Sequence, residues 1–442
     1  MIETKSKLQS KVDQGKMGSY RWVVCALLFF ATTINYLDRQ IIGLLKPALE
    51  VQFNWTESDY SSIVMAFAAS YAVGLLLFGR LIDTIGTKLG YSISIVLWSL
   101  AAMFHAAARS TLGFGIARAA LGLGEAGNFP AAIKTVAEWF PKKERAFATG
   151  IFNSGANIGA VVAPILVPWM LGVYGWEMAF IATGAVGFVW LAFWWILYEI
   201  PSRQKRLQRA EYDYIHSDSD ASTPDEVSDT TPVKWSKLLT VRQTWAFIAG
   251  KFLTDPIWWF FLFWLPSYFS SVFKLDLSKP SLHLAVVYTA TTVGSIGGGY
   301  LSSYFINKGW PVFKARKTAM LIIALCVVPI MGAQFTTDLW TVVGLISLAA
   351  AAHQAWSANI FTTASDMFPK RAVSSVVGIG GMAGSLGGVL FPLFIGLVLD
   401  HYKALDRLAG GYNVIFIVCG SAYLLAWLIM HFITPRMKPV KL

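Results

Sequence analysis

Apolar residues gather along the chain in runs that are long enough to cross a bilayer, and short polar segments separate these runs. A membrane-spanning helix needs about 20 mostly apolar residues. Twelve runs meet this requirement, six on each side of one long polar stretch, so the pattern predicts an all-α polytopic membrane protein. The predicted spans cover residues 22–44, 60–80, 89–108, 112–137, 146–171, 178–199, 245–272, 283–306, 318–336, 339–364, 372–399 and 412–434.

The polar stretch divides the chain into two predicted halves. Basic residues then set the orientation, because loops rich in Lys and Arg stay in the cytoplasm. With a cytoplasmic N-terminus, 26 of the 36 Lys and Arg residues fall on the cytoplasmic side. We therefore expect a multi-pass protein of the cell membrane, in bacteria the inner membrane, with both termini cytoplasmic. The predicted parts are a cytoplasmic tail 1–21, a six-helix half 22–200, a cytoplasmic linker 201–243, a second six-helix half 244–434 and a cytoplasmic tail 435–442.

Composition excludes several other classes of protein. Only 14% of the 442 residues are charged, about half of what soluble domains carry. The net charge of +11 is explained by loop cations, so we expect the lipid bilayer as a partner and no nucleic acid. The sequence contains no P-loop, no spacing of His or Cys typical of a metal site, and no nucleophile motif. We predict neither an enzyme nor a metal or cofactor site.

The two halves resemble each other at an offset of 228 residues. This offset places Phe140-Pro141-Lys142 on Phe368-Pro369-Lys370, and Pro164 on Pro392. Two related six-helix units are typical of transporters whose substrate binds at the midplane between the repeats. The pattern therefore predicts two pseudo-symmetric halves around a central site.

The loop between the second and third spans carries a candidate conformational latch. Its residues Gly79, Asp83, Gly86 and Lys88 fit the pattern G-x-L-x-D-x-x-G-[RT]-[RK]. Glycines let helix ends approach closely, and an aspartate can bind the N-terminus of a neighbouring helix and pair with a base. Such a contact must break and re-form when the halves move. An ordinary tight turn is the alternative.

These motifs resemble the major facilitator superfamily over essentially the whole chain. Tyr36-Leu37-Asp38-Arg39 and the segment 118–130 look like the anion:cation symporter family, while 251–259 and 353–359 look like its hexuronate branch. The resemblance implies a major facilitator fold and a monomeric secondary transporter that couples protons to a hexuronate, glucuronate or galacturonate, by alternating access. Alternatives are sodium coupling, another sugar acid or a non-sugar organic acid, and a transport-inactive sensor with this fold.

Charged residues inside the first-half spans are candidates for function, because they are costly in a membrane. A guanidinium matches a carboxylate with two hydrogen bonds, so Arg39 is expected to receive the substrate. Arg118 and Glu125 are seven residues apart and share a helix face. We expect Glu125, and Asp38 beside Arg39, to load and release the coupling proton, with Arg118 as the anchor of Glu125. Permanent structural ion pairs are the alternative.

The second half offers one more ion pair. Lys251 and Asp255 have the i, i+4 spacing that lets them pair on a helix. Lys251 is predicted to be a second cation for the substrate, and a structural pair is the alternative. Lys134, near the end of its span, is expected to reach toward the membrane surface.

Polar residues without charge complete the predicted binding site. The repeat offset places His353 opposite Glu125, and Gln354 and Asn359 follow on the same span. This cluster is expected to bind sugar hydroxyls, although a lone membrane histidine can also join two helices. Tyr71 and Asn157 are weaker candidates for the cavity wall.

Overall fold

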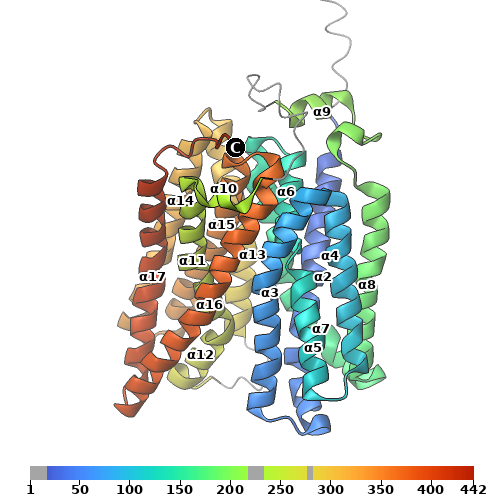
Figure 1. The fold of residues 1–442 in the computed structure, drawn as a ribbon. Helices are drawn as coiled ribbons and strands as arrows, with labels where there is room; N and C mark the ends of the chain where they lie inside the picture. The colour runs from blue at the N-terminus through green and yellow to red at the C-terminus, as the bar shows by residue number, and fades with distance from the viewer. Residues whose placement is uncertain (1–16, 218–232, 276–281) are drawn as a thin grey trace, which may run out of the picture.

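The computed structural model describes residues 17–217, 233–275 and 282–442, and these residues form a helical bundle that contains no strand (Figure 1). The prediction of an all-α polytopic membrane protein is confirmed. The first half consists of α2 (Tyr20–Phe53), α3 (Glu57–Ile85), α4 (Thr87–Phe104) with η1 (His105–Ala107), α5 (Thr111–Glu125) with α6 (Asn128–Trp139), α7 (Lys142–Tyr174) and α8 (Trp176–Leu197).

The second half repeats this order of helices. It consists of α11 (Arg242–Phe263) with α12 (Leu265–Phe273), α13 (Leu282–Asn307), α14 (Val312–Val327) with η4 (Val328–Phe335), α15 (Leu339–Met367), η5 (Lys370–Ala372) with α16 (Val373–Ala404) and α17 (Leu408–Ile433). Within the described residues, nine helical segments are long and apolar enough to cross a membrane by themselves. The pairs α5–α6 and α11–α12 and the helix α13 complete twelve spans.

Two predicted spans are broken in the middle. The first break follows Glu125, in a glycine-rich run that packs tightly against its neighbours. A side chain at Gly124 would come within 2.6 Å of the Trp98 amide nitrogen, so only glycine fits there. The second break, at Trp264, precedes Pro266 in the first turn of α12. Because proline fits the first turn of a helix but lacks an amide hydrogen, it favours a new helix start.

Short helices of the linker lie at one end of the bundle, together with the C-terminus (Figure 1). These are η2 (Pro201–Arg203), α9 (Arg209–Ile215) and α10 (Trp235–Leu239), and we call this end the linker face. The buried Glu211 of α9 accepts hydrogen bonds from the backbone amides of Tyr20 and Arg21, both at 3.0 Å. The first turn of α2 is thereby capped by the linker. The predicted limits of the linker and tails stay predictions, since 1–16 and 218–232 lie outside the described residues.

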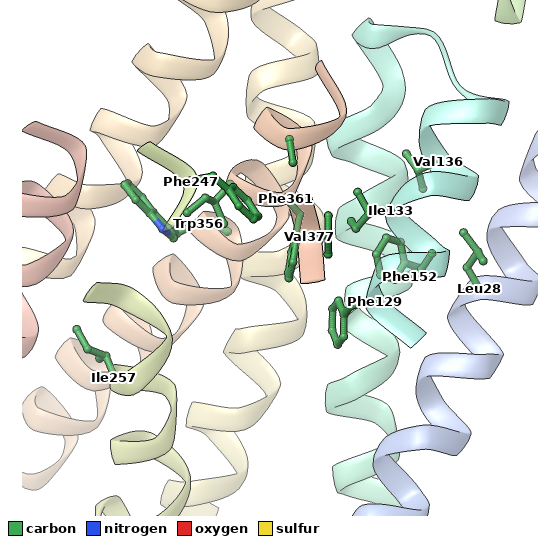
Figure 2. Packing of buried hydrophobic residues seen from close by; sticks show 14 of the residues in the cluster. Leu28, Phe129, Ile133, Val136, Phe152, Phe247, Ile257, Trp356, Phe361 and Val377 are labelled. Carbon is green, nitrogen blue, oxygen red and sulfur yellow. The ribbon is translucent and has the colours of Figure 1, made fainter. Parts of the chain in front are cut away.

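The halves join through two helix crossings near the linker face. Helix α7 packs against α13, and α3 packs against α16. Glycines allow the backbones to touch: a side chain at Gly150 would lie 2.3 Å from the Ser295 carbonyl oxygen, and one at Gly79 would lie 2.6 Å from the Ser374 carbonyl oxygen. Between the crossings, Phe129 of α6 stacks on Phe361 of α15 at a centroid distance of 5.2 Å. Both rings belong to the buried apolar cluster that Figure 2 shows in part.

Candidate functional site

A cavity lies between the two halves, and its wall comes from α2, α3, α6 and α7 on one side and from α11, α15 and α16 on the other. It holds about 730 Å³ of space not filled by atoms, including space open to solvent. The Phe129–Phe361 stack lies on its wall, and the tight α7–α13 and α3–α16 crossings lie between it and the linker face. Its wall includes Tyr36, Arg39, Tyr71, Asn153, Lys251, Asp255, Trp258, Trp259, His353, Gln354 and Ser357.

Arg39 presents its guanidinium to this cavity from α2. Aromatic rings frame the group, because it lies 4.7 Å from the ring centroids of both Tyr36 and Tyr71 and 5.0 Å from that of Phe67. Such contacts attract a cation to the negative faces of aromatic rings. The arrangement suits bidentate recognition of a carboxylate.

Glu125 holds the other side of the Arg39 guanidinium. Its Oε2 lies 2.9 Å from Arg39 Nη2 and accepts a second hydrogen bond from Nε at 3.0 Å, while its Oε1 has no partner among the described residues. The Glu125 side chain is fully buried and Arg39 is 14% exposed. The cation therefore stands between the cavity and the carboxylate. A substrate carboxylate and Glu125 would compete for the same guanidinium.

Arg118 does not contact Glu125 in this conformation, although the sequence spacing places both on one face. Its Nη2 donates to the backbone carbonyl of Arg39 at 3.3 Å, and its guanidinium lies 4.6 Å from the Phe67 ring centroid. Asp38 is buried behind the cavity, and both of its carboxylate oxygens have no hydrogen-bond partner among the described residues. Neither residue lines the cavity.

The opposite wall carries the Lys251–Asp255 pair on α11. Lys251 Nζ lies 2.7 Å from Asp255 Oδ2 and 4.0 Å from the centroid of the Phe361 ring. The Lys251 side chain is 5% exposed and that of Asp255 is 25% exposed. The order of exposure is thus reversed relative to the first wall, since both partners line the cavity here and the carboxylate is the more exposed of the two. Sequence spacing predicted the pair but not this orientation.

His353 and Gln354 also line the cavity, from α15. The His353 ring stacks on Trp258 at 5.1 Å, and its Nδ1 forms a hydrogen bond of 2.5 Å with the Tyr423 hydroxyl. The Gln354 Oε1 accepts a hydrogen bond of 2.8 Å from Asn153 Nδ2 of α7, which bridges the two halves. These side chains provide neutral polar groups beside the charged pairs, as recognition of hydroxyl groups requires.

Two predicted wall residues lie elsewhere. Asn359 is buried between helices, where its amide donates to the carbonyls of Gly298 at 2.8 Å and Ala355 at 2.9 Å. Asn157 is buried in α7, one helical turn beyond the position that reaches the cavity. Asn153 occupies that position instead. The candidate was placed on the correct helix, but sequence alone did not determine which turn faces inward.

The Asp83 cluster (Asp83, Lys134, Ser374 and Ser375) joins the halves at the linker face. Asp83 Oδ2 accepts the backbone amide of Ser375 at 2.7 Å and Oδ1 that of Ser374 at 3.3 Å, both in the first turn of α16. Lys134 Nζ lies 2.9 Å from Asp83 Oδ1. Lys134 is buried and therefore does not reach toward the membrane surface as expected; it supplies the base that pairs with Asp83.

Other residues of the latch motif have different surroundings. Gly86 has a φ of +86°, a conformation that favours glycine, in the turn between α3 and α4. Lys88 pairs with Glu199 at 3.0 Å and so ties α4 to the segment after α8 within the first half. Gly79 provides the close approach to α16 described above. The four motif residues thus shape one loop, and among their side chains it is Asp83 that crosses between the halves.

The Asp366 cluster (Asp366, Arg145 and Arg316) is a second ionic contact between the halves. Asp366 lies 2.9 Å from Arg316 Nε in its own half and 3.3 Å from Arg145 Nη1 of α7. Arg316 also donates to the carbonyl of Lys142 at 2.6 Å, again across the boundary. The sequence pattern did not indicate this cluster. Asp366 lies two residues before Phe368 of the repeated Phe-Pro-Lys motif, and that position was the available signal.

Comparison with known proteins agrees with this architecture. The family model of the Major Facilitator Superfamily matches residues 28–392 and 312–442. The chain is 34% identical over 387 residues to the hexuronate transporter of Escherichia coli K12, covering 87% of this chain and 89% of that one. It is 30% identical over 397 residues to the D-galactonate transporter of Escherichia coli O6:H1, covering 88% and 92%.

A solved structure shows the same fold. The proton:xylose symporter bound to 6-bromo-6-deoxy-D-glucose aligns with a TM-score of 0.73 at 16% sequence identity, over 95% of this chain and 97% of that one. The sequence and family matches cover most of the chain, and the cavity lies between its two halves. The chain therefore belongs to the major facilitator superfamily and is a multi-pass membrane transporter rather than an enzyme.

Proposed function

We propose that the protein is a proton-coupled symporter of a hexuronate such as glucuronate or galacturonate. The Arg39–Glu125 pair carries this proposal. When Glu125 is ionised it neutralises Arg39, and when it is protonated it leaves the guanidinium free for a substrate carboxylate. Binding of the anion and binding of the proton thus favour each other. The names of the similar sugar-acid transporters support the choice of substrate class.

Proton and substrate would then cross together. Arg39 holds the carboxylate, His353 and Gln354 contact hydroxyls, and Lys251 stays paired with Asp255 while that acid is ionised. Asp38 lies behind this site and would relay the proton to or from Glu125, and Arg118 would anchor ionised Glu125 in another state of the cycle. Release of the Asp83 cluster lets the linker face open while the opposite face closes, which is alternating access.

Orientation follows from the distribution of basic residues. In this proposal the linker face and both termini are cytoplasmic, and the protein lies as a monomer in the bacterial inner membrane. Because the halves are joined at the linker face, the described conformation is the one in which substrate enters from outside the cell.

Uptake into proteoliposomes tests the proposal. Labelled glucuronate is expected to accumulate only when the outside is more acidic than the lumen, and the Glu125→Gln variant is expected to exchange glucuronate without accumulating it. Glu50→Gln, which changes a carboxylate of α2 outside the cavity, is the matched control. Equal uptake under both directions of the pH gradient would refute proton symport, and dependence on a sodium gradient would identify the alternative ion.

Substitution of the polar α15 side chains distinguishes transport of sugar acids from transport of non-hydroxylated acids. The His353→Phe and Gln354→Ala changes are expected to abolish glucuronate uptake, because the hydroxyl partners are lost. If uptake of a non-hydroxylated organic acid were instead the native activity, that uptake would survive both changes. Binding without any transport in the unmodified protein would favour the sensor.

A further inference from the structure

The two charged walls of the cavity differ in which partner of the ion pair, the cation or the carboxylate, is more exposed. On the first wall Arg39 faces the cavity and the fully buried Glu125 stands behind it. On the second wall both partners line the cavity, and Asp255, at 25%, is more exposed than Lys251, at 5%. An anion that enters the cavity therefore meets a cation on one side and a carboxylate on the other.

An ionised Asp255 excludes a second anionic group from its wall. Its charge repels an approaching carboxylate, and it also occupies Lys251 through the 2.7 Å contact. Protonation of Asp255 removes both obstacles, because the acid then offers a hydroxyl donor and Lys251 loses its counter-ion. The second wall then has the same capacity as the first, namely one carboxylate.

We propose that Asp255 gates this second carboxylate site, so that the transporter also accepts hexarates, the sugar acids that carry a carboxylate at both ends. This inference rests on the proposed symport of hexuronates. One end of the dianion binds at Arg39 and the other binds at Lys251 beside protonated Asp255. One proton taken up by Glu125 balances the single negative charge of a hexuronate. A second proton taken up by Asp255 balances the additional negative charge of a hexarate. Both protons are released with the substrate on the other side.

Among the described residues that line the cavity, Asp255 is the one carboxylate. The first wall contributes Tyr36 and Tyr71, whose hydroxyls lie within electrostatic range of both Glu125 and Asp255. Helix α16 approaches with Gly384, where a side chain would lie 2.2 Å from Asp255 Oδ2. The titratable and charged groups around Asp255 among the described residues are Lys251, His353, Tyr423, Tyr36, Tyr71, Arg39 and Glu125.

Calorimetric binding to the purified full-length protein tests the inference with glucuronate and glucarate as the two probes. Both acids keep their charges between about pH 5.5 and about pH 7.5, since carboxyl groups of this kind ionise near pH 4. For the unmodified protein we expect glucarate binding at about pH 5.5. In Asp255→Asn, where position 255 is uncharged at every pH and Lys251 has no counter-ion, glucarate affinity relative to glucuronate is expected to rise about tenfold or more at about pH 7.5.

Two further variants make the test specific. Lys251→Met removes the second cation and is expected to lower the glucarate-to-glucuronate affinity ratio about tenfold or more. Asp213→Asn removes the carboxylate charge of the exposed i, i+4 pair Arg209–Asp213 on α9. This control is expected to leave the glucarate-to-glucuronate affinity ratio unchanged. Proton uptake into vesicles, followed with a pH-sensitive dye in the lumen, supplies a second readout, because glucarate transport is expected to import one more proton per molecule than glucuronate transport.

The outcomes separate this inference from the proposed function. Glucuronate binding without glucarate binding, in the unmodified protein at about pH 5.5 and in Asp255→Asn at about pH 7.5, would overturn the second carboxylate site alone. An affinity ratio that does not respond to Asp255→Asn or Lys251→Met would do the same. Absence of glucuronate binding under all conditions would instead overturn the proposed hexuronate transport.

Discussion

Glu125 Oε2 lies 2.9 Å from Arg39 Nη2, although the two residues are separated by 86 positions in the sequence. The contact joins the end of α5 to the middle of α2, at the edge of the central cavity. It gives the first half of the transporter one cation that both a buried acid and an entering anion can use. Substitutions at Arg39 should therefore report directly on recognition of the substrate.

Arg39→Lys keeps the positive charge of the side chain but changes the shape of the charged group. Lysine offers a single ammonium in place of the planar fork that stacks between Tyr36 and Tyr71 and reaches a carboxylate with two hydrogen bonds. We expect KM for glucuronate to rise about 10- to 100-fold, equivalent to about 1.4–2.7 kcal/mol. Initial uptake rates over a range of substrate concentrations measure this. An unchanged KM would mean that the carboxylate binds elsewhere.

Asp83→Asn weakens the closure of the linker face. The substitution leaves Lys134 buried without its counter-ion and takes the negative charge from the first turn of α16. Removing one partner of a buried ion pair costs about 3–5 kcal/mol. We expect the conformers with an open linker face to become more populated. Spin labels at the exposed positions Thr84 and Lys370, on opposite halves, should show a longer distance between them; an unchanged distance distribution would contradict the role of Asp83.

Gly150→Leu is expected to prevent the same closure by steric conflict. A side chain here would overlap the Ser295 carbonyl of α13, at 2.3 Å from the first added carbon. Gly172→Leu, on the same helix, is the matched control, since an added carbon there meets nothing within 4 Å. We expect Gly150→Leu to abolish glucuronate uptake and to lengthen the linker-face distance, with Gly172→Leu close to the unmodified protein. Normal transport by Gly150→Leu would show that this crossing need not close.

Arg316→Gln is expected to destabilise the folded protein. Arg316 is almost fully buried and pairs with Asp366 at 2.9 Å, so its loss leaves a buried carboxylate with Arg145 as its remaining ionic partner. We expect the free energy of unfolding in detergent to fall by about 3–5 kcal/mol. Arg209→Gln, which breaks a pair with side chains 84% and 57% exposed, should change it by at most about 1 kcal/mol. Equal thermal stability of the two variants would refute this assignment.

The fold could be predicted largely from the sequence, because local hydropathy identifies each span. The breaks in two spans could not, since hydropathy reports composition and not backbone path. In the span predicted over 112–137, the break after Glu125 depends on how closely Gly124 packs against Trp98 of another helix. That contact is a property of the assembled bundle.

The candidate site was predictable to the level of residue types and helices. Charges within spans drew attention to Arg39 and Lys251, and the repeat offset drew attention to His353; all three line the cavity. Spacing along one helix suggested Arg118 as the partner of Glu125, whereas the structure pairs Glu125 with Arg39. Asp366 was overlooked because it lies at a helix end, where a charge is unremarkable until its neighbours are known. Pairings between distant helices depend on packing, which a single sequence does not record.

The Asp83 and Asp366 clusters share no residue, and they differ in chemistry. Across the boundary between the halves, Asp83 accepts hydrogen bonds from uncharged backbone amides, whereas Asp366 pairs with the Arg145 guanidinium. Energetic effects of separate, non-contacting sites are usually additive. The free energy difference between the two access states could therefore be set in steps, by weakening one cluster, the other or both. A graded series of such variants would hold this transporter at chosen positions of its cycle without altering a residue of the cavity wall.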